Sequence, residues 1–459
     1  ITEVRRGREH SLSPELEKLL AGTNELADLP YEGFATLGNA DLKFPEITNE
    51  KGEKIQITNG RFVPLEESKD RRVRKEVFEK YYETFGSFKN TWATLYAGQV
   101  KQLMFYARAR KYSSTLEAAV DGNNVSPEVY KNLVEAVNDN LDKMHRYVRL
   151  RKKLLELDEL HMYDVYVPIV KDYDAKYTIE EAKELVLKAV EPLGTNYVNL
   201  IKKAFAERWI DVVENEGKRN GAYSSGVYGV HPFVLLNFNG TLDNVFTLAH
   251  EMGHAMHSYF SNEAQNYLDS RYKIFVAEVA STTNEVLLME YMLKNAKDDK
   301  ERAYLLNHYM DSFKGTVFRQ TMFAEFEKTS NEMAESGEPL THENLTKLYL
   351  DLNKKYYGEA MISDDLIGYE WMRIPHFYYN FYVYQYATGF SAAVAIANRV
   401  LKEGETAVND YMKFLQSGCT KDPVSLLRIA GVDMAAKDPI NSALQVFERV
   451  IEEMEELTK

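Results

Sequence analysis

The sequence predicts an all-α, mainly helical protein with a small β element beside its central helix. Glycine and proline, which interrupt helices, supply 24 and 12 of the 459 residues, about 8% against a usual share of about 12%. Apolar residues recur at the helical spacing of three or four positions through much of the chain, including most of 241–459. The segment Gly221–Asn239, rich in Gly, Tyr and Val, has the composition of two short strands joined by a turn.

The N-terminal half is predicted to be a series of helices with one hairpin. A short helix is expected near residues 13–20, and the Asn59-Gly60 pair between two alternating runs predicts a β-hairpin turn. The helical pattern is continuous over 66–111. Ser and Pro open a second long helix over 126–157, and the capping box at 178–181 opens a third.

Charge and composition exclude several classes of protein. The formal net charge of −14 makes a nucleic-acid backbone an unfavourable main partner. No run of 18 apolar residues is present, so a membrane-spanning helix and a membrane partner are not expected. Cys419 is the single cysteine, which excludes an internal disulfide and a cysteine-based zinc site and fits a reducing cytoplasm best.

The segment His250-Glu251-Met252-Gly253-His254 matches the pattern H-E-x-x-H inside a predicted helix. His250 and His254 share one helix face and lie about 6 Å apart along the axis, so both imidazoles can reach one ion. Glu251 lies next to that face, where it can hold a metal-bound water and accept its proton. The opposite face is apolar. The pattern therefore predicts a metal site with its own general base.

A third protein ligand is required, and the sequence offers several candidates. His257 lies about 10.5 Å along the helix axis from the first motif histidine, too far to share its ion, and Glu263 is equally remote. The next acidic candidate, Glu278, shares a helix face with Ser281 and Glu285. Spacing alone leaves two readings of Glu278 open, a metal ligand or a solvated helix carboxylate.

The sequence HEMGHAMH at 250–257, followed by AEVASTTNE at 277–285, resembles the thimet oligopeptidase family of zinc metallopeptidases. It is most similar to the oligoendopeptidase F branch, as are the segments 218–241 and 373–389. The resemblance implies a zincin-type helical fold and one zinc ion per chain. It also implies that His250, His254 and Glu278 are the zinc ligands and that Glu251 is the general base and acid.

The family also keeps a histidine and tyrosines from a later segment near its substrate. In this sequence His376 and a cluster of tyrosines occupy that place. Tyr378, Tyr382 and Tyr386 are spaced so that one helix face could present all three, and a phenol can donate to an oxyanion without being charged. The resemblance implies catalytic roles for His376, Tyr382 and Tyr386, and the alternative is that the tyrosines only pack the helix.

Three regions are predicted from these patterns. Residues 1–66 form a mixed segment, 67–217 a helical region, and 218–459 the zinc metallopeptidase catalytic region. Members of the branch carry a further N-terminal helical lobe, and this chain is expected to begin after it. If so, either that lobe or a neighbouring chain completes the wall of the active site.

The leading interpretation is a cytoplasmic zinc endopeptidase that hydrolyses internal bonds of short oligopeptides. The β element would offer its backbone to an extended peptide, although a purely structural hairpin is the alternative. Two other functions stay open: a catalytically idle helical protein that binds peptides, and a zinc hydrolase of non-peptide amides. An intact Glu251 argues against the first, because a binder needs no base there. The sequence indicates neither the oligomeric state nor the cleavage preference.

Overall fold

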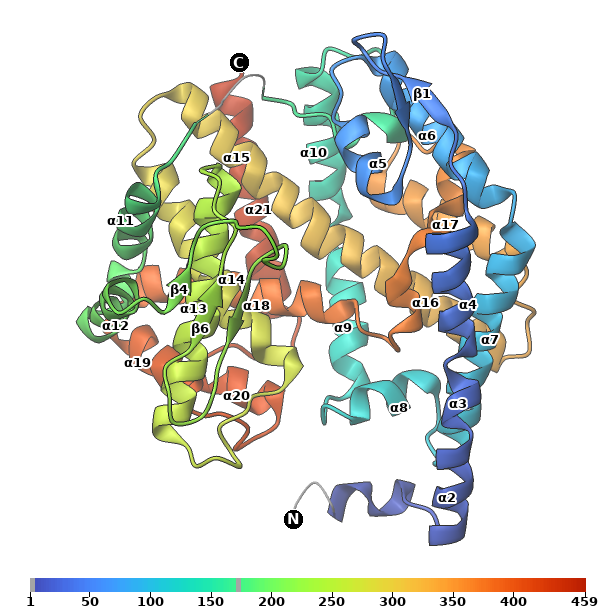
Figure 1. Cartoon of the computed structure of the whole chain (residues 1–459), viewed down its shortest axis with the longest axis horizontal. Coiled ribbons are helices and arrows are strands. Elements are labelled where there is room, and N and C mark those ends of the chain that lie inside the picture. Colours follow the sequence, from blue (N-terminus) through green and yellow to red (C-terminus); the bar gives the residue numbers. More distant parts are fainter. Residues whose placement is uncertain (1–4, 171–174) are drawn as a thin grey trace. The chain divides into compact units, whose positions relative to one another are not determined.

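The computed structural model describes residues 5–170 and 175–459, which divide into two compact units (Figure 1). Unit 1 combines residues 1–122, 144–169 and 321–384, and unit 2 combines 123–143, 170–320 and 385–459. The chain therefore passes between the units several times, and the three sequence-based regions stay a prediction. No helix within the described residues is both long enough and apolar enough to cross a membrane.

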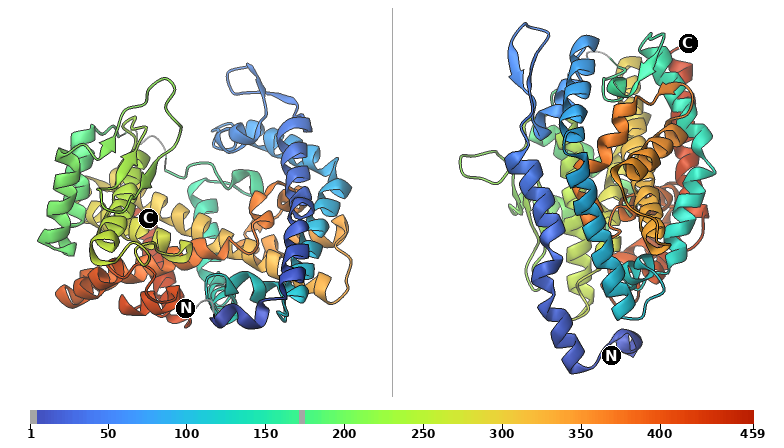
Figure 2. Two further views of the ribbon diagram at one scale, coloured as in Figure 1. Left: turned by 60° about the horizontal axis from the view of Figure 1, so that its bottom comes forward. Right: turned by 90° about the vertical axis from the view of Figure 1, so that its right-hand side faces the viewer.

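Unit 1 is built mainly of helices, with two small two-stranded sheets. Figures 1 and 2 show α2, α3 and α4 following one another, with α4 beside α7. The elements that lie wholly or mostly in unit 1 are α2 (Pro14–Gly22), α3 (Asn24–Ala27), α4 (Leu29–Thr36), β1 (Glu46–Thr48), β2 (Lys54–Gln56), α5 (Asn59–Glu66), α6 (Arg71–Gly86), α7 (Lys89–Ala109), α8 (Thr115–Asp121), α10 (Leu141–Leu154), β3 (Leu160–His161), α16 (Arg319–Glu335), α17 (His342–Tyr357), β7 (Met361–Ile362) and the 3-10 helices η6 (Asp365–Arg373) and η7 (Pro375–Tyr378).

Unit 2 surrounds the closely packed pair α13 and α14, with a three-stranded sheet against α13. Helices α11 and α12 pack on α13, and α15 packs on both α14 and α21. The α-helices and strands that lie wholly or mostly in unit 2 are α9 (Pro127–Asn138), α11 (Ile179–Ala189), α12 (Thr195–Ala206), β4 (Ile210–Asp211), β5 (Tyr223–Ser225), β6 (Phe233–Leu235), α13 (Leu242–Ala264), α14 (Ile274–Lys294), α15 (Asp299–Phe313), α18 (Tyr384–Glu403), α19 (Glu405–Leu415), α20 (Pro423–Ile429) and α21 (Asp438–Leu457).

The mainly helical prediction is confirmed, although two predicted helices are each divided in two. The pattern over 66–111 belongs to α6 and α7, which are separated at Ser87-Phe88. The pattern over 126–157 belongs to α9 and α10, which are separated at Asp139-Asn140. The capping box is present as expected: the Thr178 hydroxyl accepts from the N–H of Glu181, whose carboxylate accepts from the N–H of Thr178.

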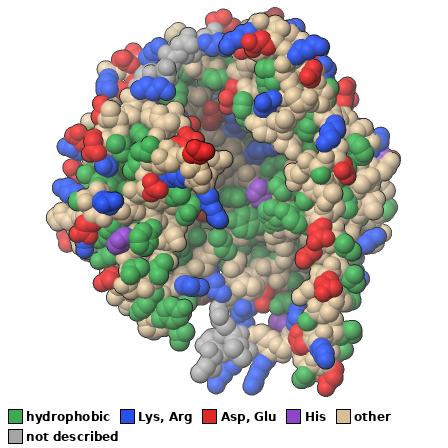
Figure 3. All heavy atoms as spheres, in the orientation of Figure 1, with side chains coloured by type: hydrophobic (Ala, Val, Ile, Leu, Met, Phe, Trp, Pro, Cys, Tyr) green, Lys and Arg blue, Asp and Glu red, His purple; other side chains and the backbone are tan. Residues whose placement is uncertain are grey.

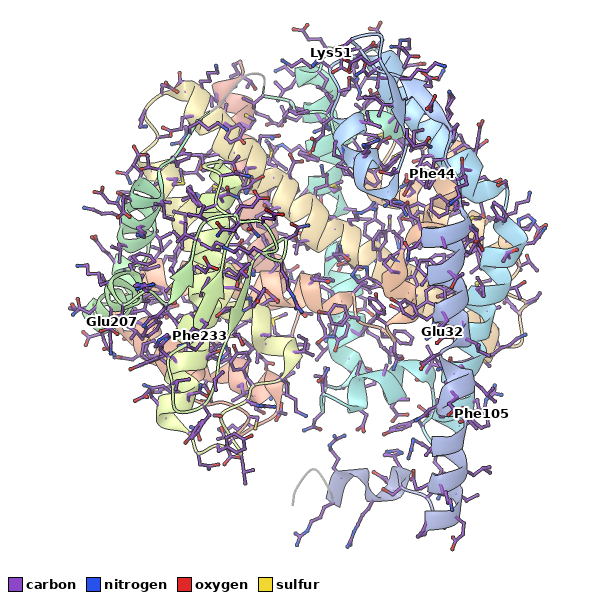
Figure 4. All side chains as sticks on the ribbon, in the orientation of Figure 1. Glu32, Phe44, Lys51, Phe105, Glu207 and Phe233 are labelled. Atoms are coloured by element: carbon purple, nitrogen blue, oxygen red, sulfur yellow. The ribbon has the colours of Figure 1, made fainter. Side chains whose placement is uncertain are left out.

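The predicted hairpin turn at Asn59-Gly60 is wrong. Strands β1 and β2 do form an antiparallel hairpin, but their turn lies earlier, where Gly52 adopts a φ of 81°. The side chain of Asn49 stabilises this turn by accepting from the N–H groups of Lys51 and Glu53; Lys51 is labelled in Figure 4. Asn59-Gly60 instead begins α5, because the preceding Thr58 caps that helix.

The β element predicted within 221–239 is present as the antiparallel strands β5 and β6. The sequence did not indicate β4, which pairs with β6 in parallel. The sheet order is β4-β6-β5, so β5 is an edge strand. Tyr223, Tyr228 and Phe233 are about half exposed on this element. Figure 3 shows hydrophobic side chains gathered over it, and Figure 4 labels Phe233 on β6.

Candidate metal centre

Helix α13 carries the H-E-x-x-H segment at its middle. Thr241 caps its N-terminus, where the hydroxyl accepts from the N–H of Asn244 at 3.3 Å. Val245, Leu248 and Met252 are completely buried, as the helical period predicted. The apolar face therefore holds the helix in the core of unit 2, and the side chains of His250 and His254 are partly buried.

The two motif histidines and Glu278 converge on one point. Nε2 of His250 lies 3.1 Å from Nε2 of His254, and Oε2 of Glu278 lies 3.3 Å from each of these nitrogens. An ion with tetrahedral bonds of about 2.0–2.1 Å separates neighbouring ligand atoms by about 3.3 Å. The three atoms thus have the spacing of three corners around one zinc-sized ion. Among the described residues, no other histidine, cysteine and acidic side chains gather in this way.

The close approach of α13 and α14 brings Glu278 to the histidines. Gly253 makes that approach possible, since a Cβ at this position would lie 2.5 Å from Cα of Ser281 and 2.6 Å from the carbonyl oxygen of Ala280. Asn284 fixes the register of the helix pair, because its amide donates to the carbonyl of Ala249 at 3.1 Å. Sequence reasoning missed this role of Gly253, although a glycine in a helix interior is a signal of close packing.

Two polar groups on α14 orient the converging side chains. Oε1 of Glu285 lies 3.3 Å from Nδ1 of His250, on the far side of the ring from Glu278. The hydroxyl of Ser281 donates to Oε2 of Glu278 at 3.2 Å. A carboxylate on the second nitrogen of a ligating histidine fixes the ring and raises its basicity. Both residues lie on the helix face that the sequence predicted.

Glu251 is buried beside the histidine pair. Its Oε2 has no hydrogen-bond partner among the described residues. Burial raises the pKa of Glu251, and this effect outweighs the opposing influence of His250 and His254. A carboxylate with a raised pKa and a free oxygen is better suited to accept a proton at neutral pH.

Electrostatics within the cluster favour positive charge beside the carboxylates of Glu278 and Glu285. Burial opposes the charged form of His250, but hydrogen bonds to Glu278 and Glu285 outweigh burial and raise the pKa of His250 to about 10. Burial likewise disfavours the carboxylate of Glu278, but hydrogen bonds from His250 and His254 lower the pKa of Glu278 far below its ordinary value. The carboxylates of Glu278 and Glu285 therefore stabilise positive charge at the imidazoles, and this donor set suits a divalent cation.

The other residues considered for the metal lie elsewhere. His257 is buried and stacks on Tyr272, with ring centroids 3.7 Å apart and planes 1° apart. Burial lowers the pKa of His257 to about 3, so the ring is neutral. Glu263 is exposed near the end of α13 and does not belong to the cluster.

His376 and Tyr382 lie close together in unit 1. His376 is carried by η7, and its ring centroid lies 6.3 Å from that of Tyr382, with the planes 20° apart. Burial lowers the pKa of His376. Tyr386 belongs to unit 2, on the first turns of α18.

Tyr386 lies three residues before Gly389, so the two residues share a face of α18. A Cβ at Gly389 would lie 3.9 Å from Cβ of Glu278, so this face of α18 passes the metal cluster.

The helical row predicted for Tyr378, Tyr382 and Tyr386 is wrong. Asn380 and Phe381 both adopt the left-handed conformation, with φ of 54° and 55°, and end the helical path after η7. Helix α18 begins only at Tyr384. The three tyrosines therefore belong to a 3-10 helix, a turn and an α-helix, and periodicity could not place them.

Comparison with known proteins identifies the family of this chain. The profile of peptidase family M3 matches residues 64–446, and the profile described as Oligopeptidase F matches residues 1–44. The chain belongs to peptidase family M3. Oligopeptidase PepF of Bacillus subtilis is 52% identical over 457 residues, which cover 100% of this chain and 68% of that protein.

Two further relatives support the same assignment. Group B oligopeptidase PepB of Streptococcus agalactiae is 46% identical over 448 residues, which cover 98% of this chain and 74% of that protein. The crystal structure of oligoendopeptidase-F from Enterococcus faecium has a TM-score of 0.84 and 43% identity, covering 100% of this chain and 77% of that chain. The resemblance to oligoendopeptidase F is confirmed, and this member of family M3 is a metallopeptidase of that type.

Proposed function

We propose that this M3 peptidase is a zinc-dependent endopeptidase that cuts internal bonds of short oligopeptides. One zinc ion per chain is held by His250, His254 and Glu278. The observation that carries this proposal is the mutual spacing of 3.1–3.3 Å among the three ligand atoms. Two imidazoles and one carboxylate leave a fourth position open, as in catalytic zinc sites. The names oligopeptidase and oligoendopeptidase of the relatives support short peptides as substrates.

Different side chains around the site have different roles in the proposed reaction. Zinc at this site would supply Lewis acidity, which polarises the scissile carbonyl and activates the attacking water. Glu251 accepts the proton of that water and delivers it to the leaving amine, a role supported by its free buried oxygen. Glu285 holds the ring of His250 through Nδ1 and keeps Nε2 directed at the ligand position.

The edge strand β5 offers a place for the peptide backbone. It is unpaired on one side within the sheet β4-β6-β5, and the sheet packs against α13. An extended peptide can add to such an edge through main-chain hydrogen bonds, while exposed apolar side chains such as Tyr223 and Phe233 contact its side chains. Replacing both Tyr223 and Phe233 by Ser tests this role. The proposal predicts a higher KM for peptides, whereas a purely structural hairpin would leave that KM unchanged.

His376, Tyr382 and Tyr386 are assigned to stabilising the oxyanion that forms on the substrate. A phenol donates without being charged, and loss of one such donor costs about 100- to 1000-fold in rate. Tyr382→Phe, Tyr386→Phe and His376→Ala should therefore lower kcat with zinc content unchanged. If all three keep more than about a third of the wild-type kcat, under 1 kcal/mol of barrier, the assignment is wrong.

Glu251→Gln tests the reaction itself. Gln keeps the size and hydrogen bonding of Glu but cannot accept the proton, so zinc and peptide should still bind while turnover of a quenched fluorescent peptide falls by several orders of magnitude. Near-normal cleavage would mean that another group is the base. A wild-type protein that binds zinc and peptide without cutting would be an idle binder, and one that cuts only non-peptide amides would be a different hydrolase.

A further inference from the structure

A buried glutamate in unit 1 contacts the turn that precedes Tyr382. Glu327 lies on α16 and is only 1% exposed. Its Oε1 accepts a hydrogen bond from the backbone N–H of Phe381 at 2.7 Å. Its Oε2 is buried and has no hydrogen-bond partner among residues 5–170 and 175–459. Placing a carboxyl group in an apolar core with one oxygen unsatisfied is unfavourable. The presence of a glutamate at this position is therefore not explained by a contribution to folding stability.

The turn that Glu327 contacts is strained. Asn380 and Phe381 are consecutive non-glycine residues in the left-handed region, with φ of 54° and 55°. Asparagine tolerates this conformation, but a phenylalanine rarely adopts it. Such strain persists only where the surrounding structure imposes it, and it clusters at functional sites. Here the N–H of Phe381 donates to Glu327 and the side chain of Phe381 is buried, so both parts of the residue are held by its surroundings.

The turn determines where Tyr382 lies. Before the turn, η7 is held by apolar contacts: Phe377 packs on Phe326 of α16, with ring centroids 4.8 Å apart. After the turn, the ring of Tyr382 lies near that of His376, with ring centroids 6.3 Å apart and planes 20° apart. A continuous helix from η7 would carry Tyr382 along the helix axis instead. The two left-handed residues therefore create the pairing of His376 with Tyr382.

We propose that Glu327 is a positioning residue for the peptidase reaction, whose buried carboxyl group fixes the Asn380-Phe381 turn and thereby sets Tyr382 against His376. The inference rests on the oxyanion role proposed for Tyr382. Burial raises the pKa of Glu327 to about 8, so the carboxyl group is mostly protonated at neutral pH and tolerates its apolar surroundings. A neutral acid still accepts through Oε1, so the contact with Phe381 does not require charge.

The test compares two replacements of Glu327 in the full chain loaded with zinc. Glu327→Leu removes the acceptor and keeps an apolar side chain of similar size, whereas Glu327→Gln keeps a neutral acceptor. The first readout is hydrogen exchange of a peptide that contains the Phe381 amide, measured by mass spectrometry. Glu327→Leu should speed exchange at Phe381 by at least about tenfold, and Glu327→Gln should not. Unchanged exchange in Glu327→Leu would overturn the proposal.

The second readout is kinetic and uses a quenched fluorescent oligopeptide. Glu327→Leu should lower kcat by about tenfold or more with KM little changed. The separate variant Glu327→Gln should keep the kcat of the wild type. Ser330→Ala is the matched control, because it removes a buried hydrogen bond to Tyr96 one turn further along α16. This variant should lower the melting temperature and leave kcat unchanged. An equal fall of kcat in the control would show that Glu327 acts only through stability.

A double-mutant cycle shows whether Glu327 acts through Tyr382. In the Tyr382→Phe background, Glu327→Leu should cause little further loss of kcat, because the group that it positions is already absent. A full multiplicative loss would refute the proposal. If Tyr382→Phe alone keeps the wild-type kcat, the oxyanion role of Tyr382 fails and this inference fails with it. If Tyr382→Phe loses kcat while Glu327→Leu does not, only the positioning role fails.

Asn380→Gly gives an independent check. Asn380 is exposed, so the change removes no buried contact, and glycine enters the left-handed region without strain. Added to Glu327→Leu, it should restore part of kcat, because the turn then needs less support from the carboxyl group. No recovery, together with additive effects in the cycle, would overturn the proposed route through the turn.

Discussion

Gly253→Ala is expected to separate the two helices that form the metal cluster. The added Cβ would lie 2.5 Å from Cα of Ser281 and 2.6 Å from the carbonyl oxygen of Ala280, whereas carbon atoms pack at about 3.5 Å or more. Helices α13 and α14 must therefore move apart locally by about 1 Å. Both contacts are backbone atoms of α14, which a side-chain rotation cannot relieve. Such overpacking typically costs about 1–3 kcal/mol of stability.

The same displacement would move Glu278 away from His250 and His254, because the acidic ligand is on α14 and the histidines are on α13. Zinc–ligand distances tolerate only about 0.2 Å, so we expect zinc affinity to fall by about 10- to 100-fold. A misplacement of 1 Å also costs about 100-fold in turnover.

Zinc affinity of Gly253→Ala is measured by competition with a chromophoric chelator, and kcat/KM with a quenched fluorescent peptide. Gly315→Ala is the control, since a Cβ there meets nothing within 4 Å. Unchanged zinc affinity and turnover in Gly253→Ala would refute the reasoning.

Three further predictions concern the second carboxylate, substrate size and pH. Glu285→Gln should weaken zinc binding by about 10- to 100-fold, measured by calorimetry, because His250 loses its charged partner; unchanged affinity would contradict this. Unfolded oligopeptides should be cleaved and a stable folded protein spared, since the peptide must bind extended; equal digestion of the folded protein and its unfolded control would count against it. Between pH 4.5 and 8 the unfolded chain has lost the Glu327 proton that the folded protein retains, because burial raises the pKa of Glu327 from 4.5 to about 8. Wild-type unfolding free energy should therefore fall as pH rises, by up to about 1.4 kcal/mol per unit relative to Glu327→Gln, in urea titrations; parallel pH profiles of the two proteins would refute this.

Periodicity and capping residues were sufficient to predict most of the helices, including the one that carries the H-E-x-x-H segment. Thr241 and Thr178 cap the helices that the sequence assigned to them, because caps and apolar periods act over a few residues. The same local signals failed at Asn59-Gly60, where the N-cap Thr58 turns a hairpin signal into the start of a helix. Continuous periodicity also concealed the break at Ser87-Phe88. Local preferences alone do not specify such breaks, which depend on tertiary packing.

Features that depend on contacts between distant segments could not be predicted from the sequence. From the sequence Glu278 could be a ligand or a solvated carboxylate, and only the packing of α14 on α13 shows that it lies within 3.3 Å of both histidines. The left-handed conformation of Phe381 has no local signal, because the residue that contacts its N–H is Glu327, 54 positions earlier. The predicted tyrosine row failed for this reason. Tertiary contacts overrode a local period at the segment proposed to stabilise the oxyanion.

Zinc content of Glu278→Ala decides whether the cluster on α13 and α14 is the metal site. The variant is purified beside the wild type and Glu263→Ala, which removes an exposed carboxylate from the same helix as the histidines, and elemental analysis gives the zinc bound per chain. We expect about one zinc in the wild type and in Glu263→Ala, and almost none in Glu278→Ala, because two histidines alone hold the ion weakly. Full zinc retention by Glu278→Ala would contradict the proposed ligand set and the mechanism built on it.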